Sequence, residues 1–243
     1  MKKQFPFLHL TVLLLLLITC ISFKDPIVYN ATSLNGAWQL QGGPNTEVVI
    51  FTNGYFMVTR YDLANKTLLR TLGGTYNVQN NQLNLLQEFN SEDNSGVGSP
   101  FSLGINIESD KIVVDIGSEQ QTWKRLDNGI APLAGVWRSG GRMQEGKVAF
   151  NPLGARKTFK ILSATRFQWT AMNTETKEFL GTGGGTYSFV NGKYTENIEF
   201  FSRDSSRVGR SLVFDGKIQD NNWHHSGLNS KGAPMSEIWG KVE

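Results

Sequence analysis

Side chains that could perform acid–base chemistry gather in the C-terminal half of the chain. Tyr194 and Glu196 alternate along the strand-like segment 193–202, and alternation in a strand puts both on one face. If that face looks inward, a carboxylate and a phenol share a cavity with Trp169. In the alternative, Glu196 faces solvent, and the residue type favours this because half-exposed strands often carry Glu.

A pair of histidines, His224 and His225, lies near the C-terminus. Adjacent strand residues point to opposite faces, so the two cannot hold one metal ion together. His224 is taken as the candidate that could exchange protons with Glu196 near neutral pH. The alternative, which is favoured, is a strand histidine bonded to a neighbour or to water. We expect neither a metal nor a cofactor.

Two further motifs point away from common enzyme classes. The glycine-rich segment 181–186 lacks the Lys-Ser/Thr of a phosphate-binding loop. The Gly-x-Ser-x-Gly signature of serine hydrolases does not occur in the sequence. The chemistry therefore depends on what positions Tyr194 and Glu196.

The elements that must position these residues are short β-strands. The strand segments are rich in β-branched and aromatic residues and are bounded by Gly, Asn, Asp or Ser: 47–52, 55–62, 111–117, 158–163, 166–172 and 193–202. Turn dipeptides that tolerate positive φ separate them: Asn53-Gly54, Asn80-Asn81, Asn191-Gly192 and Asp215-Gly216. The mature chain has no long helical pattern, which predicts an all-β fold with antiparallel neighbours.

These strands belong to an internal repeat. From Gly73 the chain reads GGTYNVQNNQLNLLQEFNSEDNSGVG, and from Gly184 it reads GGTYSFVNGKYTENIEFFSRDSSRVG, without a gap between the copies. Each copy opens on Leu-x-Gly-x-Trp, which ends at Trp38 and Trp137. The period far exceeds that of solenoid repeats, so each copy is expected to be a complete domain.

Closing the sheet of each copy into a barrel would hide its edge strands, so two tandem antiparallel up-and-down barrels are predicted. Such a barrel needs a plug, and an indole on the first strand with a cation from the last strand over its face would supply one. The expected plug residues are Trp38, Trp123 and Arg125 in the first copy and Trp137, Trp239 and Lys241 in the second. The alternative is that these tryptophans are ordinary core aromatics.

The copies differ at the residues with chemical potential. Leu83 and Leu85 stand where the second copy has Tyr194 and Glu196, so a site built on them would exist only in the second copy. The expected ligand-binding residues are Trp169, Tyr187, Tyr194 and Glu196. Glu199 is matched by Glu88, which suggests a shared structural role. On this reading the first copy is mainly a stabilising or spacing partner.

The N-terminus predicts export. It reads MKKQFPFLHLTVLLLLLITCISF, with two lysines before a leucine-rich core, as in a secretory signal. Cys20, the only cysteine, ends a lipobox-like Leu-Ile-Thr-Cys and is the expected lipidation site, although Thr before it is off-pattern. Cleavage after Ser22 and an uncleaved anchor are the alternatives. The expected location is the bacterial periplasm or outer membrane as a lipoprotein, or otherwise the medium.

The charge of the mature chain is close to balanced. Without Lys2 and Lys3, 22 Lys and Arg face 21 Asp and Glu. Nucleic acid is therefore not an expected partner. Membrane contact is expected only through a signal anchor or a lipidated Cys20.

The motifs resemble those of the lipocalin (calycin) superfamily. The opening Gly-x-Trp, the closing Trp with a basic residue, and the stretches FLGTGGGTYSFVNGKYTENIEFF, NNWHHSG and SEIWGKV are similar to uncharacterised lipocalin-like proteins of Bacteroidota. Those proteins usually end on Trp-Lys-Arg, which the first copy keeps and the second alters to Trp-Gly-Lys. The resemblance implies a small barrel behind an export signal and no established ligand or reaction.

The predicted organisation is a signal at 1–22, a first barrel at 33–126, a linker at 127–132 and a second barrel at 133–243. The function predicted is an envelope module that binds a small apolar or amphipathic molecule, or a partner protein, through one or both barrels. One alternative is an exported calycin-type enzyme that uses Glu196 with Tyr194 or a histidine. The other alternative is a structural spacer, which would have filled lumens.

Overall fold

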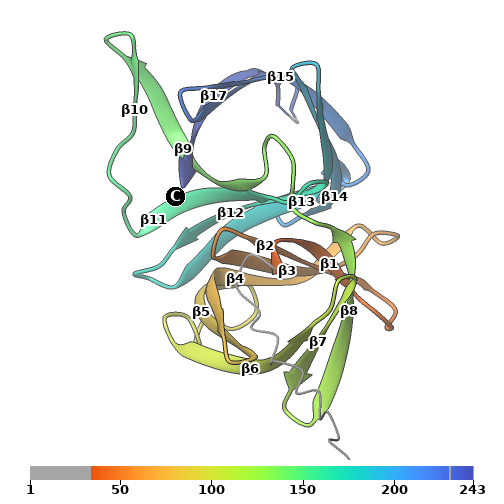
Figure 1. Ribbon diagram of the computed structural model, residues 1–243. Coiled ribbons are helices and arrows are strands. Elements are labelled where there is room, and N and C mark those ends of the chain that lie inside the picture. The colour runs from red at the N-terminus through yellow and green to blue at the C-terminus, as the bar shows by residue number, and fades with distance from the viewer. Residues whose placement is uncertain (1–33, 230, 243) are drawn as a thin grey trace, which may run out of the picture.

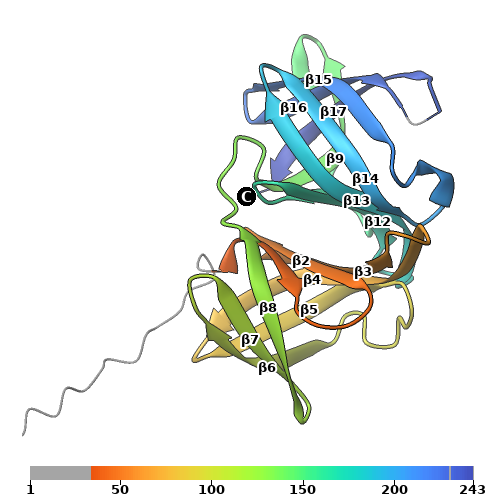
Figure 2. The same cartoon turned by 90° about the vertical axis from the view of Figure 1, so that its right-hand side faces the viewer.

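The computed structural model describes residues 34–229 and 231–242, so the expected signal segment and Cys20 lie outside the described part. It confirms the all-β prediction: two eight-stranded antiparallel barrels follow each other along the chain (Figures 1 and 2). Within the described residues, helical structure is limited to short 3-10 turns such as Ser205–Arg207. None of the helices in residues 34–229 and 231–242 is long and apolar enough to cross a membrane.

Each barrel is an up-and-down array in which chain neighbours pair. The strands of the first are β1 (Gly36–Leu40), β2 (Thr46–Thr52), β3 (Tyr55–Asp62), β4 (Thr67–Gln79), β5 (Gln82–Asn90), β6 (Pro100–Ile107), β7 (Lys111–Ile116) and β8 (Glu119–Asp127). Those of the second are β9 (Gly135–Gln144), β11 (Arg156–Leu162), β12 (Arg166–Asn173), β13 (Glu178–Val190), β14 (Lys193–Phe201), β15 (Ser211–Gln219), β16 (Asn222–Leu228) and β17 (Pro234–Val242).

The first and last strands of each barrel meet at equivalent residues. Trp38 on β1 is the neighbour of Arg125 on β8, and Trp137 on β9 is the neighbour of Lys241 on β17. The Arg125 guanidinium carbon lies 3.8 Å from the Trp38 ring centroid, and Lys241 Nζ lies 5.8 Å from that of Trp137. Both indoles are buried, so each forms a floor covered by a cation, as expected for the plug.

The closing tryptophans have a different position from the one predicted. Trp123 and Trp239 do not belong to the floors; each lines the cavity of its own barrel. The reason is the strand period, because Trp123 is two residues from Arg125 and its side chain is one layer further up the same wall. The plug therefore consists of the opening tryptophan and the cation.

Three of the four predicted turns are tight hairpins with positive φ. Asn53-Gly54, Asn80-Asn81 and Asn191-Gly192 have φ between 46° and 76°. Asp215-Gly216 instead lies inside β15, and the hairpin after this strand uses Asp220-Asn221, with φ of 51° and 58°. Asp and Asn tolerate this conformation without a following Gly, so the dipeptide pattern was wrong at this position.

The GGTY motifs mark a β-bulge in each barrel. On β4, Gly73 and Gly74 pair with Phe89 and Gln87, which leaves Glu88 as the extra residue of β5. The same irregularity lies between Gly184 and Gly185, and it leaves Glu199 as the extra residue of β14. Side-chain alternation reverses beyond a bulge. Phe200 consequently points out of the barrel, while Phe201 lines the cavity, contrary to the simple alternation expected for 193–202.

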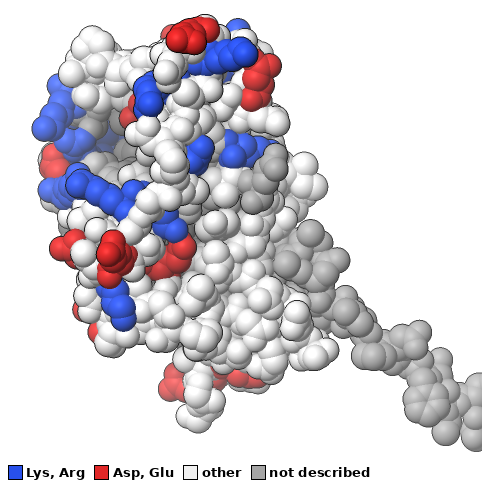
Figure 3. All heavy atoms as spheres, turned by 90° about the vertical axis from the view of Figure 1, so that its left-hand side faces the viewer, with Lys and Arg blue, Asp and Glu red and all other residues white. Residues whose placement is uncertain are grey.

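The longer second copy differs mainly in one hairpin. β9 continues beyond the barrel wall and pairs there with the short strand β10 (Lys147–Ala149), and the two project from the barrel (Figure 1). On the face that carries them, Lys and Arg gather mostly over the upper half, with Asp and Glu among them (Figure 3). The additional residues thus extend the surface and leave the barrel unchanged.

The two barrels pack through equivalent outer faces. Gly73 aligns with Gly184, so equivalent residues of β2–β5 and β11–β14 are 111 positions apart. One apolar cluster combines both barrels, with buried Ala37, Ile50, Met57, Phe89, Val136, Phe159, Ile161 and Met172. Ile50 and Ile161 are equivalent. The interface therefore has the pseudo-twofold character of a symmetric dimer within one chain.

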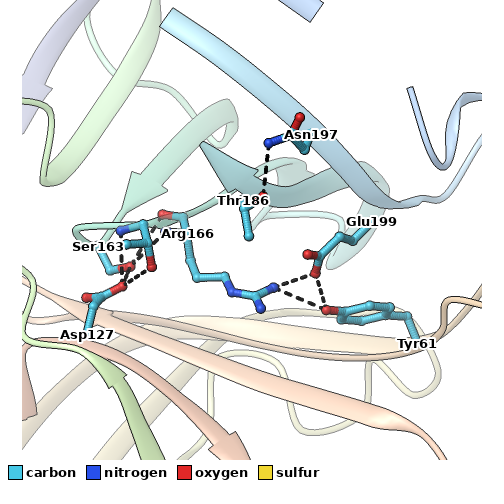
Figure 4. A network of polar contacts seen from close by, with 8 residues as sticks. Tyr61, Asp127, Ser163, Arg166, Thr186, Asn197 and Glu199 are labelled. Atoms are coloured by element: carbon cyan, nitrogen blue, oxygen red, sulfur yellow. Dashed lines mark hydrogen bonds and ion pairs between the residues drawn. The ribbon is translucent and has the colours of Figure 1, made fainter. Parts of the chain in front are cut away.

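Polar groups in this interface are paired. Buried Gln168 accepts from Thr59 Oγ1 at 2.8 Å and donates to Thr71 Oγ1 at 2.9 Å. The two bulged glutamates both reach cations: Glu88 accepts from Lys157 Nζ at 2.6 Å, and Glu199 accepts from Arg166 and from Tyr61 of the other barrel (Figure 4). The matched glutamates thus share a structural role.

Asp127, the last residue of β8, fixes the connector to the second barrel (Figure 4). Its carboxylate accepts from Ser163 Oγ at 2.7 Å, from Thr165 Oγ1 at 2.6 Å and from the Ala164 backbone N at 3.0 Å. Burial alone would raise the pKa of Asp127, but these hydrogen bonds outweigh it and hold the pKa below its usual value.

We expect Asp127→Asn to destabilise the protein by about 1–3 kcal/mol at pH 7, because the bonds to the charged carboxylate are lost. A depressed folded-state pKa contributes stability above the unfolded value of about 3.9, and this contribution is lost as the pH falls through the folded pKa. Chemical unfolding at pH 7 and at pH 2.5 should thus show a smaller difference from wild type at pH 2.5 than at pH 7. Asp215→Asn, at an exposed ion pair, is the matched control; an equal loss there would contradict the prediction.

Candidate functional site

The second barrel encloses a cavity of about 370 Å³, within the size range of small-molecule sites. Its apolar wall consists of Trp169, Ile198, Phe201, Leu212, Phe214, Met235 and Trp239. Its polar groups include Lys160, Glu196, His225 and Glu237, with Arg207 and Arg210. The cavity combines aromatic surfaces with charged groups.

A buried ion pair lies in this lumen. Lys160 Nζ donates to Glu196 Oε1 at 2.8 Å, and the two side chains are only 5% and 8% exposed. The Lys160 ammonium also lies 4.9 Å from the Trp239 ring centroid and 5.1 Å from that of Trp223. Glu196 therefore faces the lumen together with Trp169, and the favoured solvent-facing alternative was wrong. Sequence reasoning missed Lys160, although Lys160 alternates with inward Leu162 on its strand.

Tyr194 supports the ion pair from the packed core of the same barrel, beside the cavity. It is fully buried, and its hydroxyl donates to Glu196 Oε1 at 3.0 Å. Burial, with the charge of Glu196 beside it, raises the pKa of Tyr194 well above the ordinary value, so the phenol stays protonated. It is not among the cavity-lining residues. The structure therefore places Tyr194 against Glu196 and not on the cavity surface.

Tyr187 is also removed from the cavity. It is buried, it packs against Tyr194, and its hydroxyl donates to the Ser163 carbonyl at 2.7 Å. This bond anchors the loop between β11 and β12. Of the four expected ligand-binding residues, the structure therefore places Trp169 and Glu196 on the cavity and Tyr187 and Tyr194 in the packed core beside it.

The histidine that reaches the lumen is His225 and not His224. His225 is 2% exposed and lines the cavity, whereas His224 is half-buried on the opposite face of β16. Neither ring nitrogen of His225 has a hydrogen bond, although Nδ1 lies 3.6 Å from Glu237 Oε2. The signal was in the sequence: Trp223, two residues earlier, is an apolar residue that must face inward, and His225 shares its face.

The electrostatics around His225 keep its ring neutral. Burial lowers the pKa of His225 below its ordinary value, and the Lys160 charge acts in the same direction. Glu237, whose Oε2 accepts from Trp239 Nε1 at 2.9 Å, opposes the shift without reversing it. A neutral imidazole can donate through one nitrogen and accept through the other. A polar group placed in the cavity could therefore bond to it.

The first barrel is also hollow. Its cavity of about 380 Å³ has a largely apolar wall that includes Val49, Leu83, Leu85 and Trp123. Val49 and Leu85 occupy the positions of Lys160 and Glu196 in the second barrel. The two lumens are similar in size and opposite in character. The cavity of the first barrel thus does not support the expectation that this copy mainly stabilises or spaces the second.

No protein-family model matches the chain, and a search of characterised proteins found no similar sequence. The tandem of closed eight-stranded antiparallel barrels is consistent with a lipocalin-like fold.

Proposed function

We propose that the protein is an exported small-molecule-binding module of the lipocalin-like type, and that the lumen of the second barrel is a binding site. The observation that carries the proposal is the cavity of about 370 Å³ in which the buried His225 ring has no hydrogen-bond partner. A buried polar group without a partner costs about 1–3 kcal/mol. A ligand that bonds to it would recover part of that cost.

The wall defines the class of ligand. Trp169, Phe201 and Met235 offer flat or polarizable apolar surfaces, and His225 offers a donor and an acceptor. Lys160 and Glu196 neutralise each other, so they do not demand a charged ligand. An amphipathic molecule with an aromatic part and one polar group fits this arrangement best.

Export and the cell envelope belong to the same proposal. The supporting observations are the signal-like N-terminus and the lipobox-like context of Cys20, together with the resemblance to lipocalin-like proteins of Bacteroidota. A partner in the envelope that receives or delivers the ligand is compatible with such a location.

Acid–base catalysis is the second candidate function, and the His225–Glu237 contact of 3.6 Å is what favours it. Glu196 is less well placed for this role because Lys160 and Tyr194 already donate to its Oε1. An enzyme of this kind would depend on His225 with Glu237 behind it. Binding needs no such assignment, and the hollow lumens argue against a spacer with filled barrels.

The fluorescent dye 8-anilinonaphthalene-1-sulfonate tests the second-barrel site. In the Leu103→Trp variant, whose larger side chain obstructs the first lumen, we expect one dye molecule to bind per chain with a rise in fluorescence. Adding Leu212→Trp should weaken this binding at least about tenfold, because the second lumen is then obstructed as well.

His225→Phe on the Leu103→Trp background should weaken dye binding about tenfold if the sulfonate or amine bonds to the imidazole. Circular dichroism checks that each variant is folded. Equal dye binding with and without Leu212→Trp would show that the dye does not enter the second lumen, and the proposal would then be wrong.

A further inference from the structure

A row of three charged residues lies at the mouth of the first barrel. Glu47, Arg60 and Arg70 are direct cross-strand neighbours on β2, β3 and β4. They continue the inward faces that bear Val49 and Val58, and all three line the cavity. They lie at the end of the barrel opposite the Trp38 floor, because β1 and β3 both run away from the floor toward them.

Glu47 holds the two guanidiniums side by side. Its Oε2 accepts from Arg60 Nε at 2.7 Å and its Oε1 accepts from Arg70 Nη2 at 2.7 Å. The Glu47 side chain is 2% exposed, whereas those of Arg60 and Arg70 are 34% and 32% exposed. The carboxylate is therefore enclosed, and the arginines keep part of their surface open.

The row has one positive charge more than it can neutralise. One carboxylate faces two guanidiniums, and arginine stays protonated in proteins. Arg70 Nε is buried and has no hydrogen bond, so Glu47 does not use the donors of Arg70 fully. Gln121 is the other polar residue on this cavity, and it brings no charge. The mouth thus offers unused donors and a surplus of one positive charge.

The lumen below is apolar. Leu72, Leu83, Leu85, Ile112 and Val114 contribute to its wall. An extended hydrocarbon chain would bury its surface there, while a polar end would remain at the mouth.

We propose that the first barrel binds an amphipathic monocarboxylate, with its aliphatic chain in the lumen and its carboxylate on Arg60 and Arg70. Guanidiniums recognise carboxylates through paired hydrogen bonds, and the added charge balances the row. The second barrel has Thr158, Ala171 and Gly181 at the equivalent positions, so it lacks this clamp. This site does not depend on the function proposed for the second barrel.

Calorimetric titration of the full chain with decanoate and with decan-1-ol tests the proposal at pH 7.5. We expect one decanoate per chain, bound at least about tenfold more tightly than decanol, because only the carboxylate reaches the arginines. Equal affinity for the acid and the alcohol would overturn the proposal, and this comparison needs no variant.

Variants then locate the site. Arg70→Met should reduce decanoate affinity about tenfold and leave decanol binding unchanged, and Glu47 keeps Arg60 as its partner. Leu103→Trp, which obstructs the first lumen, should weaken binding of both ligands, whereas Leu212→Trp, in the second barrel, should change neither. Loss of decanoate binding in Leu212→Trp alone would assign the acid to the other lumen and overturn the proposal. The dye titration of the second barrel would be unaffected by that result.

Discussion

Lys160→Met is expected to destabilise the protein by about 3–5 kcal/mol, which is a large part of the stability of a typical domain. The substitution removes the cation that faces Glu196, whose side chain is 8% exposed. Among the described residues, the Tyr194 hydroxyl would remain as the hydrogen-bond donor to Glu196, at 3.0 Å. An uncompensated charge in such surroundings is costly because the interior does not solvate it as water does.

The first barrel supplies the matched control. Val49 and Leu85 stand at the positions of Lys160 and Glu196, so an apolar pair fits this wall. The combination Lys160→Val, Glu196→Leu and Tyr194→Phe removes both charges and the phenol that would lose its acceptor. We expect it to recover most of the lost stability.

Urea unfolding at pH 7 measures both variants. The single substitution should shift the midpoint strongly without a change in slope, and the combined variant should lie near wild type. A Lys160→Met protein as stable as wild type would show that the ion pair is solvated rather than buried.

Gly185→Ala is the second change with a large expected effect. A Cβ at this position would lie 2.0 Å from the Asn197 carbonyl oxygen and 2.8 Å from the Glu199 backbone nitrogen, and φ is +154°. Backbone atoms of the neighbouring strand cannot move aside without breaking the bulge. We expect a loss of more than about 4 kcal/mol, in the range of exceptional single substitutions.

Gly74→Ala should behave in the same way in the first barrel, since its Cβ would lie 2.0 Å from the Leu86 carbonyl oxygen. Gly154→Ala is the control, because nothing lies within 4 Å of its Cβ and its φ is not positive. Soluble yield and thermal unfolding by circular dichroism distinguish the three. A Gly185→Ala protein that melts within about 2 °C of wild type would contradict the account of the bulge.

Much of the fold could be predicted from the repeat, because it reports which positions both barrels need. The Gly-x-Trp opening led to the floor formed by Trp38 with Arg125, since a first strand and a last strand must meet in a closed barrel. The bulge could not be derived from alternation alone. It reverses the faces beyond Ile198, so Phe200 and Phe201 exchange places relative to the simple pattern.

The candidate site was harder to predict for a related reason. Glu196 looked like a surface residue because its cation, Lys160, lies on β11, 36 residues away in sequence. Which side chains meet across a barrel is set by the tertiary structure, and the local sequence pattern does not reveal it. Likewise, Val48 and Ile50 alternate with inward-facing residues, so the pattern predicts that they face solvent. They are buried instead, because the outer face of β2 packs against the second barrel.

The closure of each barrel has a consequence for how the chain folds during synthesis. β1 pairs with β8 and β9 with β17. The first strand of each barrel therefore has an unpaired edge until the last strand has been synthesised. Such contacts, distant in sequence, slow folding and leave edge strands open in the meantime. A nascent chain that has not yet released Asp127 from the ribosome has an unclosed first barrel. The outer face of β2–β5, which packs against the second barrel in the folded protein, stays exposed until β14 has also emerged. Over that interval the chain needs protection from aggregation.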